Sequence, residues 1–393
     1  MRPLYRFVLL SMALFSCNPI ASIKNEKEGK LTATHQLVES SEKNILLDNE
    51  SAPKPPYMQM IKSAEGEQIL TFLNPYKNAI FFYDYENGIL VDKIEYEKEG
   101  PDGILSPAGY FIKSMDSVYV YNKARFELAL TDSLGHVKQR ISLIGNSSGY
   151  EWTMYYPQYF FYTVNPLFEA NGKLVLTGMS PFSIADSLIG KFKFTANVDI
   201  KSGNVEFMHT YPEELYGSGA IWDGEFYTQA HPVLSPDGEL IHSFPVSHDV
   251  YVARRGVEDY KTVYAGSNTA GTINSIDNRG GRVSNEDILP HILQYDFYNG
   301  IMYDTYRKVY YRLMLQGIPN ATVNTSVFEK PVVVIIMDEQ FNYMGETVLG
   351  PWQEWNWQNS FVTPEGLVME YFNPDLDSEE EYLTLKTFTI EKM

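Results

Sequence analysis

The sequence predicts an all-β protein, and three observations support this. Aromatic residues make up 14% of the 393 residues, with 29 Tyr and 22 Phe, and these residue types favour pleated, half-buried surfaces. Polar or glycine-containing turns precede β-branched and aromatic runs at six places along the chain. No long run of apolar residues has the 3.6-residue spacing of a helix. Since 44% of the residues are hydrophobic, a packed core is expected.

The first seventeen residues form a signal peptide by pattern. Arg2 and Arg6 give a positive start, and FVLLSMALF (7–15) is an apolar stretch too short to span a bilayer as a helix. LFSC (14–17) resembles a bacterial lipobox. The resemblance implies that Cys17 becomes the lipidated first residue of the mature chain and holds it on a membrane. The alternative is an ordinary secretory signal in which the cysteine has no special role.

Cys17 is also the only cysteine, so its lipidation would leave no residue for a disulfide. Asn18 follows it, and by analogy with lipoprotein sorting we expect delivery to the outer membrane of a Gram-negative bacterium. No other run reaches the length of about 20 apolar residues that a transmembrane helix needs.

Residues 18–43 are polar, with few aromatics, and are interpreted as a flexible tether between lipid and domain. The net charge is −19, and removing Arg2 and Arg6 with the signal takes it to −21. A surface this acidic repels phosphate backbones, so nucleic acid is excluded as a partner.

A turn followed by a strand recurs six times between residues 44 and 393. The copies are SAEGEQILTF (63–72), KSMDSVYVYN (113–122), EANGKLVLTG (169–178), LSPDGELIHS (234–243), DTYRKVYYRL (304–313) and VTPEGLVMEY (362–371). A second hairpin follows in most copies, for example around Asn87-Gly88, a strong hairpin signal. Two hairpins per unit make four antiparallel strands. A four-stranded unit that repeats at the spacing of these copies is typical of propeller blades. The sequence thus predicts a six-bladed β-propeller; a pair of β-sandwiches is the alternative.

The sixth unit lacks one strand, because only EYLTLKTFTIEKM (381–393) follows its first hairpin. A blade with three strands would leave the ring open and expose a sheet edge. NILLD (44–48) is short and apolar and ends before a proline-rich stretch. We therefore predict that residues 44–48 are the fourth strand of the last blade and close the ring without a covalent link.

Two segments carry a family resemblance. They are ILTFLNPYKNAIFFYDYENGILVDKIEYEKEGPDGI (69–104) and DSVYVYNKARFELALTDSLGHVKQRI (116–141). They resemble Gram-negative six-bladed β-propeller lipoproteins of unknown function and, more distantly, NHL-type and TolB-like propellers. The resemblance implies a propeller at the cell envelope. It implies no activity and no catalytic residues.

The candidate binding residues lie on one predicted face of the propeller. This face, called the loop face below, carries the segments that join the outer strand of one blade to the inner strand of the next, and the connections between second and third strands. All five tryptophans fall in such segments, among acids and amides that could bind hydroxyl groups. The candidates are Trp152, Trp222, Asp223, Trp352, Glu354, Trp355 and Trp357. The alternative is that the indole rings wedge between blades as core.

A metal site has weak support. Pairing Leu234 with Glu239 across the SPDG turn would place His231 opposite His242, and opposed residues have Cβ atoms about 5 Å apart. Two imidazoles need a third ligand to hold a metal, so a structural pair is the simpler interpretation. NPDLDSEEE (373–381) lacks the glycine and final glutamate of a calcium loop.

Three functions remain open from the sequence. The first is a lipid-anchored module that binds a glycan, a peptide or an envelope protein through the loop face. The second is a calcium-dependent lactonase-like or esterase-like hydrolase in the propeller channel, with Asp223 or Asn171 as candidate residues. The third is a scaffold in an envelope complex. No nucleophile lies in a recognisable motif, so the sequence assigns no catalytic residue.

Overall fold

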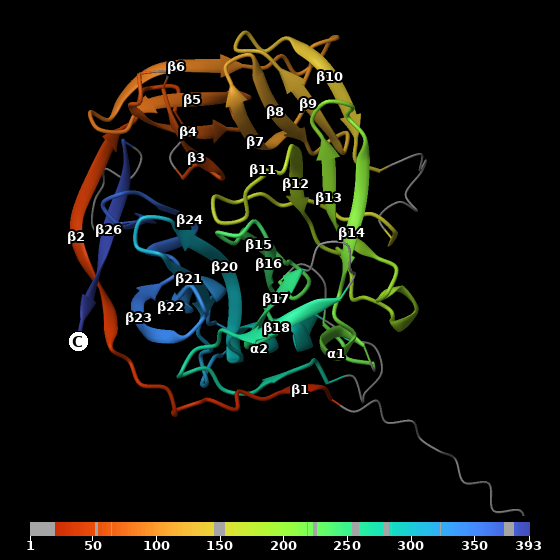
Figure 1. Ribbon diagram of the computed structural model, residues 1–393, viewed down its shortest axis with the longest axis vertical. Helices are drawn as coiled ribbons and strands as arrows, with labels where there is room; N and C mark the ends of the chain where they lie inside the picture. Colours follow the sequence, from red (N-terminus) through yellow and green to blue (C-terminus); the bar gives the residue numbers. More distant parts are fainter. Residues whose placement is uncertain are drawn as a thin grey trace, which may run out of the picture.

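The computed structural model is a ring of six four-stranded antiparallel sheets around a central axis (Figure 1). The all-β class and the six-bladed propeller predicted from the sequence are both confirmed. The structure describes residues 20–51, 54–63, 65–144, 154–217, 219–222, 226–253, 259–277, 283, 285–322, 324–372 and 381–393.

Each blade runs from an inner strand to an outer strand. Blade one consists of β3 (Met58–Lys62), β4 (Gln68–Asn74), β5 (Ala79–Asp84) and β6 (Ile89–Glu95). Blade two consists of β7 (Pro107–Ser114), β8 (Ser117–Asn122), β9 (Glu127–Thr131) and β10 (Val137–Ser142). Blade three consists of β11 (Phe168–Ala170), β12 (Lys173–Thr177), β13 (Lys193–Asp199) and β14 (Val205–Thr210). Blade four consists of β15 (His231–Leu234), β16 (Leu240–Ser243), β17 (Asp249–Ala253) and β18 (Tyr260–Tyr264). Blade five consists of β20 (Phe297–Asp304), β21 (Val309–Leu315), β22 (Pro331–Asp338) and β23 (Tyr343–Pro351). Blade six consists of β24 (Trp355–Val362), β25 (Leu367–Tyr371), β26 (Tyr382–Lys392) and β2 (His35–Leu46).

The remaining elements are short and lie between blades or within their loops. They are β1 (Ser22–Ile23), β19 (Ile273–Asn274), α1 (Glu213–Tyr216), α2 (Asn285–Gln294) and the 3-10 turns η2 (Asp186–Leu188) and η3 (Val327–Glu329). None of the helices among the described residues is long and apolar enough to cross a membrane.

All six turns of the sequence repeat connect the first and second strands of a blade, as predicted. The turn at Gly238 shows why glycine recurs there: its φ is 77°, a left-handed value that glycine adopts without a Cβ clash. The second hairpins also appear where predicted, between the third and fourth strands, with Gly88 at the first of them.

The ring is closed by pairing of the N-terminal β2 with the C-terminal β26, which lie side by side in Figure 1. The predicted partnership is confirmed at Asn44, Ile45 and Leu46, which face Thr384, Leu383 and Tyr382. The strand begins earlier than predicted, however, because pairing continues back to His35. Leu37 and Ile45 point into the core while the residues between them are mostly exposed. This outer strand can therefore be polar over most of its length.

The predicted tether over 18–43 is consequently wrong over the part that the structure describes. Residues 35–43 belong to β2, and the segment before it is held against blades four and five. Asn25 is buried and donates from Nδ2 to the carbonyl oxygens of Ser267 and Ala270, at 2.8 and 2.7 Å. Farther along, the amide of Thr34 donates to the carbonyl of Met344. Backbone pairing and a buried amide hold a segment whose polar composition suggested flexibility.

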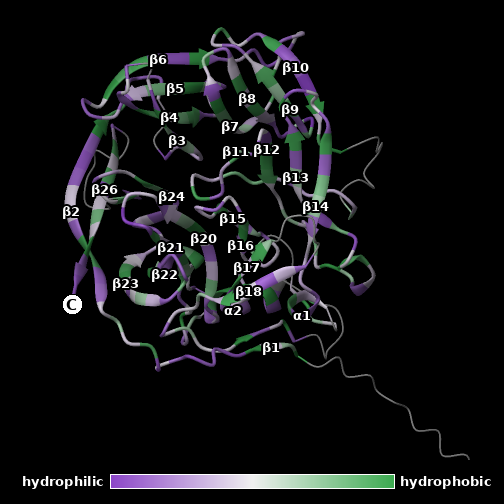
Figure 2. Cartoon of the chain, viewed as in Figure 1, coloured by the Kyte–Doolittle hydropathy of each residue, from purple (hydrophilic) through white to green (hydrophobic). Residues whose placement is uncertain are grey.

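The core lies between neighbouring blades rather than inside one of them. Large aromatic side chains fill these interfaces, and the fully buried ones include Tyr57, Tyr110, Tyr121, Tyr298 and Tyr311. In Figure 2 the middle strands of the blades, for example β4 and β12, carry hydrophobic stretches, whereas the outer strands β2 and β10 carry long hydrophilic stretches. The high tyrosine and phenylalanine content thus supplies the wedges between six sheets, since flat rings bury much area in a narrow gap.

We predict that the buried face of the closing strand is needed for stability. Ile45 is completely buried, whereas its neighbour Leu46 is 56% exposed. Ile45→Ala should lower the free energy of unfolding by about 2–4 kcal/mol because it leaves a cavity. Leu46→Ala should change it by less than about 0.5 kcal/mol. Urea unfolding followed by fluorescence measures both, and equal effects would show that β2 does not close the ring as described.

Candidate binding site

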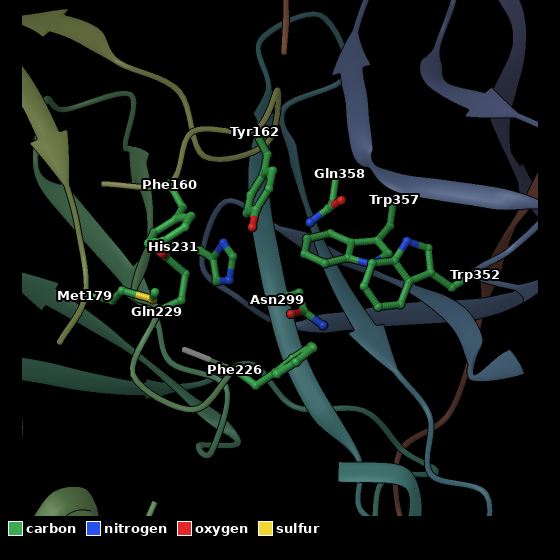
Figure 3. Close-up of a pocket in the computed structure, with 10 residues that line it drawn as sticks. All are labelled: Phe160, Tyr162, Met179, Phe226, Gln229, His231, Asn299, Trp352, Trp357 and Gln358. Carbon is green, nitrogen blue, oxygen red and sulfur yellow. The ribbon is translucent and has the colours of Figure 1, made fainter. Parts of the chain in front are cut away.

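A cavity of about 140 Å³ lies on the loop face, between blades three, four, five and six. Figure 3 shows its side chains arranged around a common space. They come from the segment before β11, the end of β12, the segment leading into β15, the inner strand β20 and the start of β24. The lining residues are Phe160, Tyr162, Met179, Phe226, Gln229, His231, Asn299, Trp352, Trp357 and Gln358.

Aromatic rings form most of the wall. Trp357 is central to it: its ring centroid lies 5.7 Å from that of Trp352, 6.2 Å from Tyr162 and 6.1 Å from His231. Phe226, which is 39% exposed, lies below Trp357 in the view of Figure 3. The cavity therefore offers flat apolar faces on several sides.

Two β-bulges deliver side chains to this cavity. In β24, pairing with β25 jumps from Asn356↔Glu370 to Ser360↔Met369, so Trp357 and Gln358 leave the sheet and reach the pocket. In β20, pairing with β21 jumps from Tyr298 to Ile301, which frees Asn299 in the same way. Bulges commonly re-aim side chains beside functional sites.

The two bulges are linked through Val164, which lies in the loop before β11. A Cβ on Gly300 would lie 2.7 Å from Cγ2 of Val164, which is closer than real Cβ atoms approach, so only glycine fits. The amide of Val164 in turn donates to the carbonyl of Gln358, at 3.2 Å. The positions of Asn299 and Gln358 are therefore coupled through the loop that also carries Tyr162.

Three polar atoms at the cavity are buried and have no hydrogen-bond partner within the described part of the chain. They are Nδ1 of His231, Oε1 of Gln229 and Nε1 of Trp357. The amide nitrogen of Gln229 is used, since it donates to the carbonyl of Ala230 at 2.7 Å. A buried polar atom without a partner costs about 1–3 kcal/mol. This cost falls on three residues that line one cavity.

Among the described residues, the lining of the cavity includes no acid, lysine or arginine. Burial, with the nearby Arg312 charge, lowers the pKa of His231 to about 3. The imidazole is therefore neutral at physiological pH. Its Nδ1 donates or accepts according to the tautomer.

Arg312 lies behind the wall of the cavity and is completely buried. Its guanidinium donates to Oγ of Ser243 at 2.9 Å and to the carbonyls of Ser247 and Ala265 at 2.8 and 3.0 Å. It also lies over the ring of Tyr298, 3.9 Å from the centroid. These contacts distribute the positive charge over backbone carbonyls and a ring face, and the charge disfavours a cationic ligand in the cavity.

A buried carboxyl supports the β24 bulge from behind. Oε2 of Glu370 accepts from Nδ2 of Asn356 at 2.7 Å and from Nδ2 of Asn359 at 2.6 Å. Asn359 also donates to the carbonyl of Pro55 and accepts from Oγ1 of Thr163. Burial raises the pKa of Glu370 to about 7, although both amides oppose the shift.

The predicted platform of exposed tryptophans is wrong for the four that the structure describes. Trp222, Trp352, Trp355 and Trp357 are between 1% and 9% exposed. Trp222 donates to the carbonyl of Leu215 at 2.8 Å and packs on Tyr227, while Trp355 packs on Tyr371 and Phe388. Indole rings fill the spaces between blades, which is the alternative left open by the sequence.

The other predicted candidates divide as follows. Trp352 and Trp357 line the cavity, whereas Trp222, Trp355 and the partly exposed Glu354 are not among its lining residues. Cys17, Trp152 and Asp223 lie outside the described residues. Sequence reasoning missed Gln229, Asn299 and Gln358. Nothing in the sequence marks the bulges that present Asn299 and Gln358, and no pattern singles out Gln229 in the segment leading into β15.

The predicted pairing of His231 with His242 is wrong by one residue. Leu234 faces Leu240, so His231 faces Ser243, while His242 faces Pro232 on β15 and Tyr251 on β17. The turn contains five residues, with Ser235 and Glu239 closing it through a 2.8 Å backbone bond. Since one extra turn residue reverses every side chain beyond it, the two imidazoles lie on opposite faces.

No group of three His, Cys, Asp or Glu side chains in the described ranges is placed to hold a metal ion. Asn171, one candidate for a calcium-dependent site, lies in the turn between β11 and β12, on the face opposite the cavity.

The fold and the cavity define a six-bladed β-propeller with a neutral, aromatic pocket on its loop face. The chain belongs to the DUF4221 family, a domain of unknown function whose model matches residues 34–348. A crystal structure of a DUF4221 member from Bacteroides vulgatus is similar, with a TM-score of 0.75 and 20% identity, covering 92% of this chain and 99% of that one.

A presumed exported protein from Bacteroides fragilis is also similar in structure, with a TM-score of 0.56 and 11% identity over 91% of this chain and 96% of that chain. No curated protein sequence matches this chain. At these identities the solved structures support the propeller fold alone.

We predict that Glu370 makes stability depend on pH. Its pKa is higher in the folded protein than its ordinary value of 4.5, so the stability it contributes is present at low pH and is lost as the pH rises through 7. Glu370→Gln keeps the shape without the charge. Relative to the wild type it should gain up to about 3 kcal/mol between pH 5 and pH 8.

The comparison with Glu370→Gln is needed because buried histidines act in the opposite direction. Burial lowers the pKa of His231, His248 and His291 to about 3, 4 and 4, so their contribution is lost as the pH falls below 6.5. Urea unfolding of both proteins at several pH values separates the two effects. A difference between variant and wild type that does not change with pH would contradict the assignment.

Proposed function

We propose that the protein is a binding module of the cell envelope and that its central cavity holds one uncharged sugar ring. The observation that carries this proposal is the set of three unpartnered polar atoms, on His231, Gln229 and Trp357, in a cavity walled by aromatic rings. A ligand that satisfies these atoms while covering the rings removes the cost of burying them.

The chemistry of the wall favours a sugar over other ligands. A sugar hydroxyl donates and accepts at once, so one ring can accept from Nε1 of Trp357 and donate to Oε1 of Gln229. Its C–H face stacks on indole and phenol rings. An aliphatic or phenylalanine side chain would leave the three polar atoms unpaired. Anions find no cation among the described lining residues, and cations face the Arg312 charge behind them.

The size of the cavity supports a single ring. A cavity of about 140 Å³ is close to the 150 Å³ of an engineered apolar cavity that binds benzene. The cavity therefore has room for no more than one six-membered ring.

We further propose that lipid on Cys17 anchors the protein to a membrane outside the cytoplasm. The lipobox-like LFSC at 14–17 supports this, and one structural relative is a presumed exported protein. Ile20, three residues later, is already part of the described structure. Three residues span at most about 10 Å, so a lipid on Cys17 would hold the rim near β1 close to the membrane surface.

The sugar proposal is tested with two tryptophan variants. Trp357→Phe keeps a ring in the wall but removes the N–H donor, so affinity for a neutral sugar should fall about tenfold, the worth of one good hydrogen bond. Trp222→Phe is the matched control, because its indole is buried elsewhere and already bonded. It should lower stability by about 1–3 kcal/mol, because it removes a hydrogen bond and leaves a cavity, and leave affinity unchanged.

Calorimetry with the monosaccharides glucose, galactose, mannose and N-acetylglucosamine, chosen after a screen on an array of neutral glycans, measures these affinities. Equal losses in Trp357→Phe and Trp222→Phe would indicate a general effect on folding. An array without any binding would contradict the proposal.

The anchor is tested by Cys17→Ala in the full-length protein expressed in a Gram-negative host. The wild type should incorporate radiolabelled palmitate and sediment with membranes, since cysteine is the acceptor for the acyl chains. The variant should incorporate none and be recovered without membranes. Unchanged labelling would show that the lipid, if any, is attached elsewhere.

A further inference from the structure

A line of aromatic rings leads from the cavity to the protein surface. Trp357 is 4% exposed, Trp352 is 9% exposed and Phe328 is 50% exposed. The ring centroids of Trp357 and Trp352 are 5.7 Å apart, and those of Trp352 and Phe328 are 4.8 Å apart. The ring contacts thus continue from the wall of the pocket to an exposed ring.

Phe328 is fixed in place. It lies in η3, where the amide of Phe328 donates to Oγ of Ser326 at 3.3 Å and the amide of Ser326 donates to Oε1 of Glu329 at 2.7 Å. This capping box orders a turn that would otherwise be loose. The carbonyl of Phe328 also accepts from the amide of Gln353, at 2.8 Å.

Polar groups accompany this outer ring. Gln353 is exposed and directly follows Trp352 in the chain, and its backbone is tied to that of Phe328. An amide side chain beside an aromatic face can bind sugar hydroxyls while the C–H face lies on the ring. The inner cavity and the outer surface therefore share one kind of chemistry.

We propose that Phe328, Trp352 and Gln353 form a second subsite, which binds the sugar unit next to the one in the cavity. The inference rests on the proposed function of the cavity and deepens it. Since the cavity has room for one ring only, a second unit must lie outside it, and the aromatic line gives it a place. The ligand is then a neutral oligosaccharide chain, whose one unit enters the cavity, rather than a free monosaccharide.

The test compares chain lengths. For the sugar that binds in the monosaccharide panel, the wild type should bind the disaccharide about tenfold more tightly, because the second unit gains an aromatic contact. Phe328→Ala should remove this gain and leave monosaccharide affinity unchanged. Phe328→Leu, which keeps bulk without a flat ring, should also lose the gain. Calorimetry measures both affinities of each protein, on proteins whose melting temperatures have been compared.

Tyr306→Ala is the matched control. Tyr306 is 53% exposed and lies on the same blade, but in the turn between β20 and β21 on the opposite face. It should change neither affinity. A disaccharide that binds no more tightly than the monosaccharide overturns the second subsite while the cavity proposal stands. Equal losses of both affinities in Phe328→Ala also overturn it. Absence of any sugar binding is instead a failure of the proposed function.

Discussion

The closed ring is the constraint on which the rest of this structure depends. Each blade is an open four-stranded sheet that can bury its faces only against two neighbours, so the first and last blades must meet. Here the ring is closed by backbone pairing of β2 with β26, over residues 35–46 and 382–392. With a single cysteine in the chain, hydrogen bonds and packing hold the ends together.

The cavity depends on that closure. A chain of hydrogen bonds runs from the amide of Met58 to Thr163, then to Asn359, and from Asn359 to the carbonyl of Pro55 and to Glu370. It joins the start of blade one, the loop before blade three and the inner strand of blade six across the axis. The same Asn359 belongs to the bulge that presents Trp357 and Gln358. Opening the ring would therefore disturb the wall of the pocket directly.

The fold was largely predictable from the sequence because propeller turns are local. Gly238 and the Asn87-Gly88 pair predict hairpins, because these turns need backbone conformations that few other residues adopt. The closing strand was predictable because a three-stranded blade would expose an edge. Its full length was not, because most of β2 is polar and an outer strand needs only Leu37 and Ile45 to face the core.

The site was predictable only in part, because the sequence pattern determines neither how deeply a side chain is buried nor the pairing register of the strands. Sequence identified the segments around Trp352 and Trp357 but could not tell an exposed indole from one wedged between blades. The pairing of His231 failed on one extra turn residue. Asn299 and Gln358 reach the cavity through bulges, which arise from packing between blades, as the contact of Gly300 with Val164 shows. Such contacts join residues more than 100 positions apart and leave no local pattern.

The most direct test of the account observes the indole N–H of Trp357 itself. In protein labelled with 15N-tryptophan, each of the five indoles gives one resonance, which Trp357→Phe and Trp222→Phe assign for these two residues. Titration with the neutral sugar selected on the array should shift the Trp357 signal as its N–H gains an acceptor, and leave the Trp222 signal in place. A titration that saturates binding without moving the Trp357 resonance would show that the sugar does not occupy the cavity.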